Sequence, residues 1–158
     1  MQGTAKPTAE VARNMLELAN RGIAALQNSP SGPWIALWAG TVTLLRTVGH
    51  ALVVDAKRDP RLSVAQQEWW IKVQGHKSNP GENFKIFWHF IDKDKNNLLH
   101  DAIINASQSV TIYPEPRGAI YDFKMISGPY SGYDSTKLVK QAATWWVEQI
   151  AEIERNAV

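Results

Sequence analysis

The chain of 158 residues contains no cysteine. This absence excludes a disulfide framework, a thiolate zinc site and a cysteine nucleophile, and it is typical of proteins from a reducing cytoplasm. An excess of charge is also lacking, because 17 Lys and Arg face 15 Asp and Glu and leave a formal net charge of +2. Such an even balance does not by itself indicate a nucleic-acid partner or an anionic membrane.

Long hydrophobic runs are absent too. The most apolar run, residues 34–45, is too short to span a bilayer and is followed by Arg46. The first residues contain no positive segment followed by an apolar core, so they predict no secretory signal. We therefore expect a soluble cytoplasmic protein with no membrane association.

Motifs for cofactors are missing as well. The sequence has no Gly-rich phosphate loop and no Gly-x-Ser-x-Gly elbow, and its histidines lack the spacing of zinc ligands. The run Asp92-x-Asp94-x-Asn96 resembles only the start of a calcium loop, because Asn97 and Ile103 stand where Gly and Glu are required. We expect neither a metal nor another cofactor.

What the sequence does contain is helical periodicity over most of its length. Apolar residues recur at intervals of three and four, and Pro, Gly and Asp mark the breaks. The predicted helices are residues 8–27, 33–56, 63–74 and 84–104, and a last one that begins after Asp134 or Ser135. Thr8 is expected to cap the first helix, whose predicted buried stripe is Val11, Met15, Leu18, Gly22 and Ala25 or Leu26.

Two short β-branched and aromatic segments, residues 110–113 and 119–123, predict a β-hairpin within an arm of about residues 109–132. A lone hairpin is marginally stable in water, so it must dock on the helices or on a second copy of the protein. The predicted fold is all-α, a four- to five-helix bundle with a β-hairpin insertion before the C-terminal helix. Residues 1–158 are expected to form a single domain.

A polar block interrupts the otherwise apolar segment 84–104. Residues 92–97 read DKDKNN, and His100 closes the block. Two adjacent Asn lower the helix propensity, and a local rule broken inside a consistent element often marks a functional position. Lys95, Asn96 and His100 are therefore the first candidate site. The alternative is structural, with His100 hydrogen-bonded to a carbonyl or to Asp101 and the lysines solvated.

Arg46 and His50 form a second candidate pair, one turn apart on the most apolar helix. A buried Arg needs an acidic partner or an opening to solvent. Glu68, Asp92 and Asp94 are the candidate partners. In one interpretation Arg46 and His50 line the same cleft as His100 and bind substrate. In the other they belong to an internal ion pair that fixes the helix register.

The stretch FIDKDKNNLLH resembles the signature of the HEPN (higher eukaryote and prokaryote nucleotide-binding) superfamily, in which an Arg, commonly followed by Asn, precedes a His with four to six residues between them. Here Lys95 occupies the Arg position, followed by Asn96, and four residues separate Lys95 from His100. The stretch LLRTVGHALVVDAK also resembles a helix of small bacterial members. The resemblance implies a homodimer in which the two motifs face one shared groove.

The resemblance further implies RNA binding or metal-independent RNA cleavage, in a toxin–antitoxin or phage-defence setting, with an antitoxin protein as a further partner. Lysine at position 95 retains a cation but loses the bidentate fork of arginine. Two alternatives stay open. One is a non-catalytic HEPN-like module that binds a nucleotide or a protein partner, and the other is a structural dimer whose hairpin completes the partner's surface.

Overall fold

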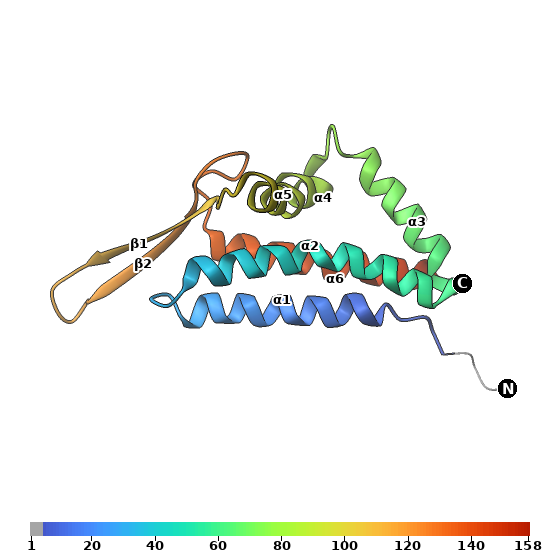
Figure 1. Ribbon diagram of the computed structural model, residues 1–158, viewed down its shortest axis with the longest axis horizontal. Helices are drawn as coiled ribbons and strands as arrows, with labels where there is room; N and C mark the ends of the chain where they lie inside the picture. Colours follow the sequence, from blue (N-terminus) through green and yellow to red (C-terminus); the bar gives the residue numbers. More distant parts are fainter. Residues whose placement is uncertain (1–4) are drawn as a thin grey trace.

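The computed structural model describes residues 5–158, which are mostly helical (Figure 1). The elements are α1 Glu10–Asn28, α2 Trp34–Arg58, α3 Pro60–Gly75, α4 Gly81–Ile86, the π-helical segment η1 Phe87–Ile91, α5 Asp92–Asp101, β1 Ala106–Ile112, β2 Ala119–Met125 and α6 Ser135–Asn156. Because α4, η1 and α5 follow one another without a break, they form a single helical rod. Residues 5–158 therefore contain five helical rods. The predicted helical fold with a hairpin before the last helix is confirmed.

Helices α1, α2 and α6 lie side by side along the long axis of the molecule (Figure 1). The α4–η1–α5 rod crosses above them and is seen nearly end-on, and α3 angles away from the end of α2. Two tryptophans from different helices, Trp34 of α2 and Trp146 of α6, are among the largest fully buried side chains. These two bulky rings therefore fill the core between the helices.

The start of α1 differs from its prediction. Its first backbone N–H groups are satisfied by Asp55 of α2, whose carboxylate accepts hydrogen bonds from the N–H groups of Val11 and Ala12, both at 2.9 Å. Thr8 does not cap the helix; its hydroxyl donates to the carbonyl of Lys6. The buried stripe is also one position away from the predicted one and consists of Ala12, Leu16, Ala19, Ile23 and Leu26.

Helix α3 begins three residues earlier than predicted. Asp59 caps it by accepting a hydrogen bond from the backbone N–H of Arg61 at 3.0 Å, and Pro60 occupies the first helical position. Pro fits there because its missing N–H would have no partner in the first turn. The Gln66 side chain takes no part in capping α3 and is available for another contact.

The predicted helix 84–104 is confirmed as far as Asp101, but its predicted apolar stripe is not. The side chains of Phe87, Phe90 and Ile91 are fully buried in η1, where a π-helical turn changes the phase of the helix before α5 starts. The helix ends at Asp101, and Ala102 adopts a left-handed conformation with φ 54°. Leu99 is 61 % exposed, so the apolar stripe does not continue to residue 104 as expected.

The hairpin is antiparallel, with Ala106 opposite Met125 and Ile112 opposite Ala119. Its base docks on the helices through Phe123, whose ring stacks on Trp34 with centroids 4.3 Å apart. Its far end extends beyond the α1–α2 turn (Figure 1). Docking on the bundle is one of the two arrangements that the sequence allowed.

Among residues 5–158, helix α2 has the length and composition that a membrane-spanning helix requires. Core helices of soluble proteins meet the same criterion, and α2 buries one face in the bundle. Its buried residues are Trp34, Trp38, Thr41, Val42, Leu45, Val48, Ala51, Leu52 and Asp55.

Candidate functional site

The centre of the candidate site is an ion pair between α2 and α5. The Nε atom of Arg46 donates to an Asp92 carboxylate oxygen at 3.0 Å, and the side-chain amide of Asn96 donates to the other oxygen at 3.1 Å. Both members of the pair are largely buried. Of the three acids considered as partners for Arg46, the structure selects Asp92, and it brings the predicted residues Arg46 and Asn96 together on that carboxylate.

Arg46 also packs against its surroundings. Its guanidinium carbon lies 5.4 Å from the centre of the Phe87 ring. One turn along α2, Gly49 makes room for this arrangement, since an added Cβ would lie 3.1 Å from an Arg46 terminal nitrogen and 3.3 Å from the Trp146 ring. A glycine inside a helix costs up to about 1 kcal/mol relative to alanine, so its presence here serves the close packing.

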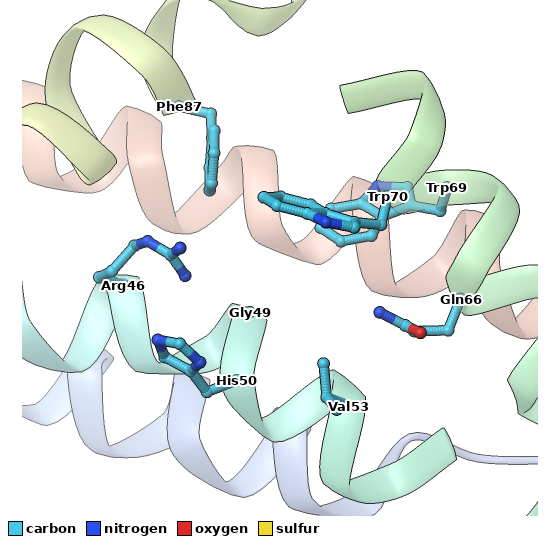
Figure 2. A pocket seen from close by; sticks show the side chains of 8 residues that line it. All are labelled: Arg46, Gly49, His50, Val53, Gln66, Trp69, Trp70 and Phe87. Atoms are coloured by element: carbon cyan, nitrogen blue, oxygen red, sulfur yellow. The ribbon is translucent and has the colours of Figure 1, made fainter. Parts of the chain in front are cut away.

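Beside Arg46 lies a cavity of about 230 Å³ between α2, α3 and η1 (Figure 2). Its walls are mainly apolar and aromatic, and Arg46, His50 and Gln66 supply the polar side chains. The lining residues are Arg46, Gly49, His50, Val53, Gln66, Trp69, Trp70 and Phe87. The structure therefore places both predicted substrate-binding residues, Arg46 and His50, on one cavity.

The His50 imidazole lies on the same side of α2 as the Arg46 guanidinium (Figure 2). The pKa of His50 is lowered because part of the ring is desolvated, and because Arg46 and Lys95 place positive charge near it. An imidazole with a lowered pKa is neutral at pH 7 and can accept a proton. Lys95 thus contributes its charge to the neighbourhood of His50.

His100 lies apart from this group. It is exposed in the last turn of α5. A step of five residues along an α-helix turns through roughly 140°, so the side chains of Lys95 and His100 leave the helix axis in different directions. Asn96 and His100, four residues apart, share a face. The site predicted from the polar block is therefore divided: Asn96 is bound to Asp92, the charge of Lys95 acts on His50, and His100 lies at the exposed end of α5.

Asp94 is a buried acid for which the sequence analysis assigned no role beyond a possible partner of Arg46. It is 5 % exposed, and one carboxylate oxygen is buried without a hydrogen-bond partner in the described residues. Burial raises its pKa to about 7, against the opposing effects of a hydrogen bond with Asn105 and the charge of Lys93. A signal existed in the sequence, because Ile91, Asp94 and Leu98 continue the helical spacing of the buried face.

Among the residues that the structure describes, no group of three or more His, Asp and Glu side chains is arranged to hold a metal ion. Comparison with known proteins gives no match to a family model, to a curated protein or to a solved structure. The function must therefore be argued from the site itself.

Proposed function

We propose that the protein binds RNA and cleaves it as a metal-independent, HEPN-like endoribonuclease. The observation that carries the proposal is the grouping of a proton-accepting imidazole, His50, with the cation of Arg46 on one aromatic cavity, where the charge of Lys95 also acts on His50. A phosphodiester needs positive charge near its oxygens and a base near the adjacent hydroxyl for cleavage without a metal.

The reaction is an internal transesterification. His50 accepts the proton of a ribose 2′-hydroxyl, and the 2′ oxygen forms a bond to phosphorus as the bond to the 5′ oxygen breaks. The 5′ oxygen takes up a proton from water, because His100 lies apart from this group. The products are a 2′,3′-cyclic phosphate and a 5′-hydroxyl, and no water is consumed.

Arg46 suits the phosphate because Asp92 engages only its Nε atom. The terminal nitrogens form no hydrogen bond within residues 5–158, and the guanidinium extends toward the cavity (Figure 2). Asp92 fixes the orientation of Arg46, and Asn96 in turn holds Asp92. The carboxylate therefore acts on the substrate only through Arg46.

The second candidate function is a non-catalytic module that binds a nucleotide or a protein partner. It is favoured by the Arg46–Asp92 pair, which neutralises the guanidinium within the protein, and by Lys95 at the position where the HEPN signature has Arg. In this alternative His50 and the cavity contribute to binding only.

A cleavage assay with EDTA and a labelled single-stranded RNA separates these two functions. The unaltered protein is expected to produce 2′,3′-cyclic phosphate ends, and Lys95→Arg is expected to raise the rate because a planar guanidinium can form bidentate bonds to a phosphate. Intact RNA with every version, together with retained RNA binding, would select the non-catalytic module.

A homodimer is part of the proposal, as the family resemblance implies. It is supported by Leu99 in the last turn of α5 and by Ile103 just after that helix, which are 61 % and 52 % exposed and lie near His100 in the sequence. Light scattering should give twice the 17.7 kDa mass of one chain, and a Leu99→Lys variant should give the single mass. A toxin–antitoxin or phage-defence role in the cytoplasm, with an antitoxin protein as partner, remains the proposed setting.

A further inference from the structure

Gln66 is the most unusual polar side chain of the cavity wall. It is only 7 % exposed, yet its amide forms no hydrogen bond to any residue from 5 to 158. Its amide end is directed into the cavity, across from Arg46 (Figure 2). Neither amide atom is sealed from solvent, so the amide is free to hydrogen-bond to a ligand that enters the cavity.

The rest of the wall is suited to a flat ring. Trp70 is half-buried and projects into the space between η1 and α2, with Trp69 and Phe87 beside it (Figure 2). On the opposite wall, Gly49 has no side chain and Val53 is small. At about 230 Å³ the cavity is smaller than the roughly 300–1,000 Å³ of sites for drug-sized ligands. One ring system fits inside, and the remainder of a ligand must lie outside.

The positions of the polar groups define the ligand further. An amide offers a donor and an acceptor side by side, which matches the edge of a nucleobase. Arg46 and His50 lie at the other end of the cavity, where a charged group attached to the ring would be located.

From this arrangement we infer that the cavity is a base-binding subsite, in which a nucleobase unstacked from single-stranded RNA packs against Trp70, hydrogen-bonds to Gln66 and places its phosphate at Arg46. Unstacked bases of single-stranded RNA are commonly bound in this manner, by stacking on aromatic side chains and by hydrogen bonds to base edges. The inference rests on the proposed RNA function and adds the substrate form and the role of Gln66.

Calorimetry with nucleoside 5′-monophosphates tests the subsite, and ribose 5-phosphate serves as the ligand that lacks a base. The four nucleotides should bind at least about fivefold more tightly than ribose 5-phosphate, because base stacking is worth roughly 1–3 kcal/mol. Equal affinity for ribose 5-phosphate and the nucleotides, or no binding of nucleotides at millimolar concentration, overturns the inference. This comparison needs no variant.

A pair of variants then tests Gln66. Gln66→Leu should weaken nucleotide binding roughly three- to tenfold, whereas Gln67→Leu, its exposed neighbour on α3, should leave binding unchanged. Equal effects of the two substitutions would remove Gln66 from the subsite.

Monophosphates have no internal bond to cleave, so the binding result is independent of catalysis. Base-dependent binding without RNA cleavage would leave the subsite standing and end the proposed ribonuclease activity. Cleavage without base-dependent binding would leave the ribonuclease activity standing and end the proposed subsite.

Discussion

Two carboxylates of helix α5, those of Asp92 and Asp94, lie two residues apart in different environments. Asp92 is held by Arg46 and Asn96. Asp94 lies beside the apolar residues Trp38 and Val42 of α2, and one of its oxygens has no partner among residues 5–158. The difference shows that the polar block of the sequence is not one site: Asp92 belongs to an organised charged site, and Asp94 is a buried acid.

The largest expected effect concerns the charged site around Arg46, Asp92 and His50. If His50 is the base, His50→Ala should lower the rate of RNA cleavage by about 10²–10⁴-fold, and His100→Ala should lower it much less. Rates of both variants, measured in EDTA on the same RNA, check this. If His50→Ala retained cleavage and His100→Ala lost it, the catalytic centre would lie at the end of α5 instead.

The next effect concerns Asp94. Its pKa is raised from 3.8 to about 7, so its protonated form stabilises the folded protein fully below pH 3.8 and this contribution is lost as the pH rises through 7. Asp94→Asn should therefore increase the free energy of unfolding at pH 8, by up to about 4 kcal/mol, and change it little at pH 4. Urea unfolding at both pH values is the measurement.

The matched control is Asp101→Asn, an exposed acid on the same helix, which should show no such pH dependence. If Asp94→Asn destabilises the protein equally at pH 4 and pH 8, the buried carboxylate has a partner that the described structure does not reveal.

The third effect tests the ion pair between Arg46 and Asp92. Asp92→Asn leaves the largely buried Arg46 without its anion, and the free energy of unfolding should fall by about 2 kcal/mol. Glu17→Gln, which removes an exposed ion pair with Arg21, should cost less than about 0.5 kcal/mol. Urea unfolding at pH 7 is the measurement. Equal losses of the free energy of unfolding in the two variants would show that Asp92 is no more than a surface charge.

The smallest effect sharpens the role of Gly49. Gly49→Ala should lower the free energy of unfolding by about 1 kcal/mol, because the added Cβ would contact Arg46 and Trp146. Gly40→Ala, on the same helix with open space around its Cβ, should raise it by roughly 0.5–1 kcal/mol. Thermal unfolding of both variants is the measurement. Changes of opposite sign in the free energy of unfolding confirm the close packing at Gly49, and changes of the same sign contradict it.

The sequence predicted what depends on neighbours along the chain. The helical segments, the hairpin and the cap of α6 at Asp134 follow from spacing and capping rules, and the structure has them. It did not predict the Asp55 carboxylate at the start of α1, because Asp55 is 44 positions away from Val11 and 43 positions away from Ala12 in the sequence. It also missed the π-helical turn of η1, which sets the direction in which α5 presents its charges.

The candidate site was predicted in part for the same reason. Arg46 and His50 were identified together because they are one turn apart, but three acids remained equal as partners until the crossing of α2 and α5 selected Asp92. Gln66 was not among the candidate site residues. Its position on the cavity depends on the angle at which α3 leaves α2, which no local pattern encodes.

The most direct test of the account is an NMR titration of the imidazole signals with a short RNA that carries 2′-O-methyl groups and so resists cleavage. The signals of His50 are expected to shift more than those of His100, since His50 lies on the cavity that receives the nucleotide. Shifts confined to His100, with His50 unchanged, would contradict a site built on α2 and α5.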